Sequence, residues 1–163
     1  MVSGPLPARH NETSRKEPDS KARLRLWIRL LRATRLIEND VRERFKSTFD
    51  ATLPRFDVMA ALYRYPDGML MSEISRFLMV SNGNVTGIVD RLVSDGFVVR
   101  AQRNGDRRTS FVSLTRKGRT VFETMAAAHE TWIDELLEKM TVRDAAQLSK
   151  KLKTFRSNWE GGV

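Results

Sequence analysis

Apolar residues recur at helical spacing through most of the chain, and the spacing changes to alternation at one place. From residue 21 to residue 49 they fall on a single stripe, which predicts one long helix. The stripe consists of Leu24, Trp27, Leu31, Thr34, Val41 and Phe45. Arg25, Arg29 and Arg32 follow the opposite side, where they form either a solvated face or a binding surface.

Three shorter helices are predicted between residues 52 and 95. Thr52 is expected to cap the first, Ser72 the second, and Ser81 or Asn82 the third. The sequence Tyr-Pro-Asp-Gly at 65–68 separates the first two as a turn. Their expected inward residues are Phe56, Met59, Ala60 and Tyr63, then Ile74, Phe77 and Leu78, then Val85, Ile88, Val89 and Leu92.

Beyond Gly96, which ends the third helix, the apolar period becomes about two. Residues 97–102 and 109–114 flank an Asn-Gly pair, which is a strong signal for a β-hairpin. Thr115 then caps a long helix, and Thr141 with Asp144 opens a final one. Their apolar stripes are Phe122, Met125, His129, Trp132, Ile133, Leu136, Leu137 and Met140, then Leu148, Leu152, Phe155 and Trp159.

A short helix, a tight turn and a second helix are the arrangement of a helix-turn-helix. The outward positions of the second helix carry mostly short polar side chains that suit a DNA major groove: Asn82, Asn84, Thr86, Gly87, Asp90 and Arg91. Helix capping is the alternative explanation, and it accounts for Ser81 and Asn82. It does not account for Asn84, Thr86 and Gly87, so the composition favours DNA binding.

The tip of the hairpin concentrates positive charge. Arg103, Arg107 and Arg108 surround its Asn-Gly turn together with Asp106. A hairpin beside a helix-turn-helix is a wing, and an arginine at its tip can enter the narrow minor groove. Asp106 can fix one guanidinium while another is presented to DNA.

The charge of the whole chain agrees with a polyanionic partner. The 163 residues carry a net charge of +9, with a pI near 10.5, and nucleic acid is the first partner that this balance suggests. The chain has no cysteine, which excludes disulfides, thiolate metal sites and cysteine-based redox sensing. Without an apolar run long enough to span a membrane, a cytoplasmic protein with no membrane partner is expected.

The sequence offers little for an enzyme. It has no phosphate-binding glycine loop and no cysteine nucleophile, and its two histidines, His10 and His129, lie far apart. We therefore expect no catalytic residue, no metal and no cofactor. His129 is either a hydrogen-bonded core residue or a group that binds a ligand.

Two stretches resemble the MarR (multiple antibiotic resistance regulator) family of transcription factors. They are MSEISRFLMVSNGNVTGIVDRLVSDGFVVR and NGDRRTSFVSLTRKG, and with the flanking helices the resemblance covers residues 21–159. It implies a mainly α fold with a small β-hairpin wing, a winged helix-turn-helix, assembled as a homodimer that reads palindromic double-stranded DNA. It further implies a pocket for a small anionic effector. The stretch LMVSNGNVTGIVDRL is similar to the branch of the family that senses aromatic acids or their CoA thioesters.

Carried over by position, the resemblance assigns roles to individual residues. Arg91 would hold phosphate, and Arg108 would enter the minor groove with Asp106 orienting Arg107 or Arg108. The recognition residues would be Ser81, Asn82, Asn84, Thr86 and Gly87. Gly87 stands where many relatives have a larger polar or basic side chain, which puts base readout at that position in doubt.

The expected organisation has three parts. Residues 1–20 form a disordered tail, 21–50 and 116–159 a helical dimerisation region, and 51–115 the DNA-binding domain. An effector pocket is expected from Trp27, Arg25, Arg29, Arg32, Phe56, Tyr63 and His129, although the same rings could be plain core. The main function expected is a sequence-specific regulator, most simply a repressor released by its ligand. The alternative is a non-specific nucleic-acid-binding or nucleoid protein without a ligand.

Overall fold

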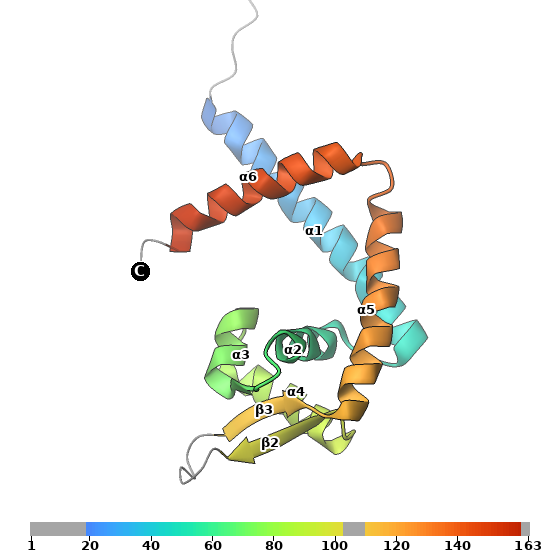
Figure 1. The fold of residues 1–163 in the computed structure, drawn as a ribbon. Coiled ribbons are helices and arrows are strands. Elements are labelled where there is room, and N and C mark those ends of the chain that lie inside the picture. Colours follow the sequence, from blue (N-terminus) through green and yellow to red (C-terminus); the bar gives the residue numbers. More distant parts are fainter. Residues whose placement is uncertain (1–18, 103–109, 161–163) are drawn as a thin grey trace, which may run out of the picture. The chain divides into compact units, whose positions relative to one another are not determined.

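The computed structural model describes residues 19–102 and 110–160. By its internal contacts the chain divides into two compact units, one that ends at Leu36 and one that begins at Ile37. The first helix, α1 (Asp19–Phe49), spans this boundary, and the other elements belong to the second unit. Figure 1 shows the order of the elements along the chain.

The long first helix is confirmed, and its apolar stripe has two different environments. Val41 and Phe45 are buried in the second unit. Leu24 and Trp27 remain 57% and 58% exposed. The expected stripe therefore packs within its own chain at the C-terminal part of the helix and is left uncovered toward the N-terminus.

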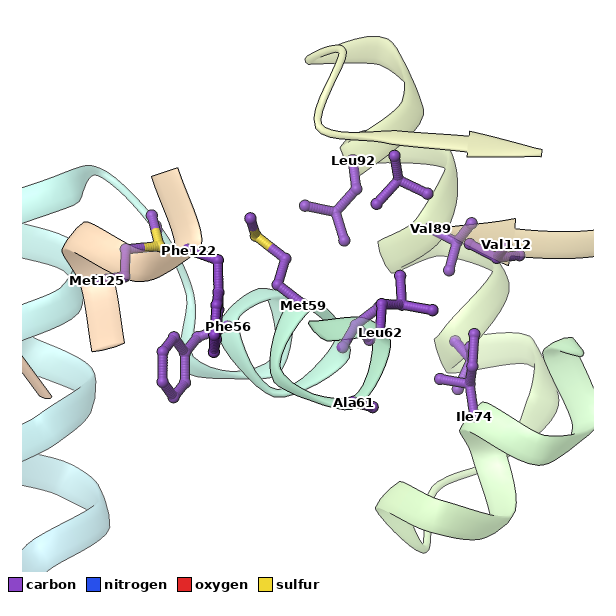
Figure 2. Packing of buried hydrophobic residues seen from close by; sticks show 14 of the residues in the cluster. Phe56, Met59, Ala61, Leu62, Ile74, Val89, Leu92, Val112, Phe122 and Met125 are labelled. Atoms are coloured by element: carbon purple, nitrogen blue, oxygen red, sulfur yellow. The ribbon is translucent and has the colours of Figure 1, made fainter. Parts of the chain in front are cut away.

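Helix α2 (Leu53–Arg64) provides the centre of the core. It follows Thr52 with Pro54 in its first turn, as predicted, although the Thr52 side chain makes no capping hydrogen bond. Its side chains Met59 and Leu62 are each 1% exposed. In Figure 2, Leu62 lies among apolar side chains of the neighbouring elements, with Val112 and Ile74 both to its right in the view.

Helix α3 (Met71–Leu78) differs from the prediction in two ways. Its N-cap is Leu70, whose backbone N–H donates to the Glu73 carboxylate at 2.8 Å, so the expected cap at Ser72 is wrong. Phe77, expected in the core, is 41% exposed, because the short helix turns only one narrow face inward and Ile74 occupies it. The helix ends at Met79, which has a left-handed backbone with φ 55°.

Helix α4 (Asn82–Ser94) begins and ends where the sequence predicts. The Ser81 hydroxyl accepts a hydrogen bond from the Asn84 backbone N–H at 3.4 Å. After the helix, Gly96 has φ 73°, a conformation that side chains with a Cβ disfavour. The chain can therefore turn sharply from the helix into the sheet.

A three-stranded antiparallel sheet follows, in the order β1-β3-β2. The predicted hairpin is present as β2 (Val98–Gln102) and β3 (Ser110–Leu114), paired from Val98 with Leu114 to Gln102 with Ser110 (Figure 1). The short strand β1 (Met69–Leu70) pairs with the other edge of β3 and was not predicted.

Helix α5 (Arg116–Leu136) starts at the predicted cap and packs closely on the sheet. The Thr115 hydroxyl accepts from the Gly118 backbone N–H at 2.9 Å. A Cβ at Gly118 would lie 1.9 Å from the Phe97 carbonyl oxygen, so this position has room only for glycine. The helix ends at Leu136, so Leu137 and Met140 lie beyond it rather than on its stripe.

The last helix, α6 (Val142–Glu160), opens with the predicted contact. The Asp144 backbone N–H donates to the Thr141 hydroxyl at 3.2 Å, and that hydroxyl donates to the Asp144 carboxylate at 2.6 Å. Every side chain of this helix from Val142 to Phe155 is exposed. Within the described parts of the chain, no helix has the length and apolar character needed to cross a membrane.

Candidate nucleic-acid interface

Helix α4 has one face in the core and one face in solvent. Val85, Val89 and Leu92 are 0% exposed and hold the helix against α2 and α3. The positions predicted to read DNA, from Ser81 to Arg91, all lie on exposed positions of this element. The predicted division of the helix into a packing side and a free side is therefore confirmed.

Three of the predicted recognition side chains already bond to their own chain. The Ser81 hydroxyl caps the helix. The side-chain oxygen of Asn82, Oδ1, accepts a hydrogen bond from the Ser75 hydroxyl of α3. The Thr86 hydroxyl donates to the Asn82 backbone oxygen at 2.9 Å. Each keeps only part of its hydrogen-bonding capacity for another molecule.

The other predicted recognition residues, Asn84, Gly87 and Arg91, make no such bond within the described chain. Among the described residues, neither the side-chain amide of Asn84 nor the guanidinium of Arg91 has a hydrogen-bond or ion-pair partner. A Cβ built on Gly83 or Gly87 meets nothing within 4 Å. The face thus offers free polar groups at Asn84 and Arg91 beside two places where the helix backbone itself is accessible.

An ion pair connects this helix to the sheet. Arg100 Nη2 of β2 lies 2.6 Å from Asp90 Oδ1 of α4. Sequence analysis placed Asp90 on the outward face and did not single out Arg100, so it missed the pair. The spacing of ten residues across a helix end and a turn gives no periodic signal that could have revealed it.

A second charged contact fixes the C-terminal end of α4. Arg55 of α2 pairs with Asp95, and their side chains are 18% and 32% exposed. Lys117 Nζ donates to the Asp95 backbone oxygen at 3.0 Å. The Arg55 Nε atom is buried without an acceptor among the described residues, so the guanidinium serves this junction through its other nitrogens.

The predicted wing residues lie outside the described residues. These are Arg103, Asp106, Arg107 and Arg108, within 103–109. The structure describes β2 up to Gln102 and β3 from Ser110, so it places the two strands on which this segment is carried. The role of the wing arginines stays a prediction.

Three of the expected effector residues lie together in the second unit. The Phe56 ring is 4.9 Å from the His129 ring, and Phe122 lies 5.4 Å from Phe56 and 4.7 Å from the Tyr63 ring. The Tyr63 hydroxyl donates to Glu123 at 3.0 Å. Burial among these rings lowers the pKa of His129, because a charged imidazole is poorly solvated there.

The other four expected effector residues, Trp27, Arg25, Arg29 and Arg32, lie on α1 in the first unit, where all are exposed. The seven residues are therefore described in two separate units. Among the described residues, no group of three or more histidine, aspartate or glutamate side chains could hold a metal ion.

A half-buried carboxyl on α2, next in sequence to Phe56, was not singled out from the sequence. Desolvation raises the pKa of Asp57 on α2 to about 6, Glu38 of α1 raises it further by repulsion, and Arg42 lowers it. A helical sequence pattern shows that Asp57 follows a core residue, but it does not show that α1 covers it.

Comparison with known proteins places this site in context. The sequence model described as MarR family matches residues 51–110. The chain is 30% identical over 131 residues to the transcriptional activatory protein BadR of Rhodopseudomonas palustris, covering 77% of this chain and 74% of BadR.

Solved structures show the same likeness. A MarR family transcriptional regulator from Silicibacter pomeroyi superimposes with a TM-score of 0.74 at 33% identity, covering 88% of this chain and 99% of the other. A mutant MarR from Escherichia coli in complex with operator DNA gives a TM-score of 0.72 at 24% identity, covering 85% and 99%, which is a likeness of fold.

Proposed function

The chain belongs to the MarR family of DNA-binding transcriptional regulators, and we propose that it binds a palindromic operator as a homodimer through the exposed face of α4. The observation that carries this proposal is the contrast between the two faces of that helix. One face buries Val85, Val89 and Leu92, and the other leaves Asn84 and Arg91 without a partner among the described residues, beside the bare backbone at Gly83 and Gly87.

The chemistry of these groups suits a major groove. An asparagine amide can bond the N6 and N7 edge of adenine with two hydrogen bonds. An arginine near the end of the helix can hold a phosphate, which fixes register without reading sequence. Asn84 is therefore the base-reading candidate and Arg91 the phosphate-binding candidate. Ser81, Asn82 and Thr86 hold the helix in shape and offer their remaining groups.

Selection of bound duplexes from a random pool tests this function directly. A sequence-specific regulator should favour its selected site over random duplex by about a thousandfold or more. Asn84→Ala should reduce affinity for the selected site and leave affinity for random duplex nearly unchanged. Arg91→Ala should weaken both and reduce the salt dependence by about one unit. Gln147→Ala, an exposed amide on α6, is the matched control.

Equal affinity for all duplexes would instead support a non-specific nucleic-acid-binding protein of the nucleoid type. That alternative shares the basic character of the chain but needs no uncommitted base-reading side chain. The selection experiment separates the two, because a non-specific protein enriches no sequence.

We further propose repression as the mode of regulation and release by a small anionic ligand, an aromatic acid or its CoA thioester. The support is one exposed indole, Trp27, and two exposed cations, Arg29 and Arg32, on opposite sides of the same stretch of helix. An indole can stack on an aryl group, and guanidinium groups bind carboxylates and phosphates. Phe56, Tyr63 and His129, which are also expected to bind the ligand, lie in the second unit, where their close ring contacts equally suit a core.

A titration of benzoates, hydroxycinnamates and their CoA esters into the protein–operator complex tests the ligand. The proposed class should release DNA, and Arg29→Ala should reduce the sensitivity of release to the ligand without changing operator affinity. If every compound leaves the complex intact, the ligand proposal is wrong and the DNA proposal stands. A reporter gene behind the operator decides the direction of regulation, since BadR is named an activatory protein.

A further inference from the structure

Asp90 and Arg100 join the two elements that would meet one DNA duplex. Asp90 lies on α4, and Arg100 lies in β2 of the hairpin that carries residues 103–109. The two side chains are 2.6 Å apart at their closest nitrogen and oxygen. Among the residues that the structure describes, no other ion pair connects α4 with the sheet.

Apolar packing holds only the inner end of the hairpin against the helix. Val89 of α4 and Val98 of β2 belong to the same buried cluster and are 0% and 1% exposed. Arg100 is the next side chain on the same face of β2, because residues two positions apart on a strand point the same way, and it is 38% exposed. The Asp90–Arg100 pair therefore lies at the edge of the apolar contact between α4 and β2.

The carboxylate is unexpected at its position on the helix. Asp90 lies one turn beyond Thr86 and two turns beyond Asn82, in one row along the outward face. A carboxylate on a DNA-binding face repels the phosphate backbone. If charge alone mattered on this face, an uncharged residue would serve better than Asp90.

We propose that Asp90 and Arg100 are a positioning pair that sets the angle between α4 and the β2–β3 hairpin. This inference rests on the proposed function, in which the helix and the hairpin engage the same duplex. Contacts to bases require both elements in register, whereas the electrostatic attraction to phosphates does not depend on sequence. The pair then contributes to sequence preference and little to the stability of the fold, as expected for side chains that are 38% and 54% exposed.

Asp90→Asn distinguishes positioning from a charge effect, because the two predict opposite results. Removal of a negative charge by itself raises affinity for the selected operator and for random duplex alike. A positioning role lowers operator affinity by about fivefold, the scale of one exposed ion pair, while affinity for random duplex stays equal or rises. Asp90→Glu retains the carboxylate and should recover most of the operator affinity.

Asp95→Asn, at the C-terminal cap of the same helix, is the matched control. Asp95 pairs with Arg55 of α2 and not with the sheet. Its substitution should lower the unfolding temperature while leaving the ratio of operator affinity to random affinity unchanged. Asp90→Asn should lower the ratio of operator affinity to random affinity while leaving the unfolding temperature nearly unchanged. Faster hydrogen exchange should be confined to the backbone amides of β2.

Each result has a definite reading. A parallel rise of both affinities in Asp90→Asn, or an unchanged ratio, overturns the positioning role and leaves the proposed function intact. Equal affinity of the unaltered protein for selected and random duplexes removes the proposed function and this inference with it.

Discussion

At the scale of single residues, Met79 in the turn of the helix-turn-helix has an unfavourable backbone conformation that the packing of its side chain does not offset. Met79 has φ 55° and is 86% exposed. The left-handed conformation costs a residue with a Cβ about 1 kcal/mol relative to glycine. Because the side chain buries so little, its packing offsets hardly any of this cost.

Met79→Gly should therefore raise the free energy of unfolding by about 1 kcal/mol, measured by urea denaturation at fixed protein concentration. Met79→Ala removes the same side chain but keeps the Cβ, so it should bring no comparable gain. If both variants gained equally, the side chain rather than the backbone would be the source of the cost.

Gly87 is the opposite case to Met79, because its backbone conformation does not require glycine. It lies inside α4 with ordinary helical backbone, and a Cβ there would meet nothing within 4 Å, so the fold itself gives no reason for glycine. Gly87→Ala should raise the free energy of unfolding by about 0.5–1 kcal/mol, because glycine loses more conformational freedom in a helix.

The same substitution should weaken operator binding more than binding to random duplex, since the added methyl group stands between the helix backbone and the bases. Thermal unfolding and binding titrations on one preparation check both effects. A more stable variant with unchanged operator affinity would show that nothing approaches the backbone at Gly87.

At the scale of elements, helices and the hairpin could be predicted because their signals are local. Thr115 acts within a few residues and caps α5 where expected, and the two strands on either side of the Asn-Gly pair are present where the sequence predicts them. Strand β1 could not be predicted, because two residues, Met69 and Leu70, form it only by pairing with β3 some forty positions later. The Ser72 cap failed for a similar reason, since the chain already turns at Leu70 to make that pairing.

The candidate site was predictable to the same extent. Periodicity separates the buried and exposed faces of α4, so the predicted reading positions are on the free side. Which of those side chains is free depends on contacts with other elements, such as Ser75 with Asn82 and Arg100 with Asp90. Those contacts come from tertiary packing and leave no mark on the spacing of residues in α4.

The junction of α1 and α2 should make stability depend on pH. The pKa of Asp57 is about 6 in the folded protein, above its ordinary value of 3.8. The folded state therefore binds more protons between these values, and the free energy of unfolding should fall as pH rises from about 4 to about 6. His129 acts in the opposite direction, because its lowered pKa makes acidification below 6.5 unfavourable.

Asp57→Asn should remove the loss of stability between about pH 4 and about pH 6. It should also raise the free energy of unfolding at pH 7 by about 1 kcal/mol, allowing for screening by solvent. The remaining pH dependence should then follow His129, with stability lost on acidification. Urea denaturation at pH 4.5, 6 and 7.5 measures both, and Asp134→Asn on α5 controls for the loss of one charge. Identical pH profiles for the two variants would contradict the role of Asp57.

At the scale of the whole molecule, the chain exposes more apolar surface on two helices than a monomer normally shows. Leu24, Leu26, Trp27, Ile28 and Leu36 on α1 and Leu148, Leu152 and Phe155 on α6 are between 37% and 71% exposed. Each group lies on a helix that does not bury it within the described chain. Such surfaces usually mark contact with another protein, and a second copy is the partner that the proposed palindromic operator requires.

Sedimentation at micromolar concentration should therefore give about twice the chain mass of 18.7 kDa. Leu148→Asp with Leu152→Asp places charge in the apolar row of α6 and should shift the protein toward monomer, because an unpaired buried carboxylate is costly. Lys150→Asp changes charge on the other side of the same helix and should leave the dimer intact. Since two DNA-binding units must act together on a palindrome, the double variant should also lose most of its operator affinity while its helices remain folded. A protein that sediments as a folded monomer and still binds the operator tightly would show that the apolar surfaces of these helices contact something other than a second copy.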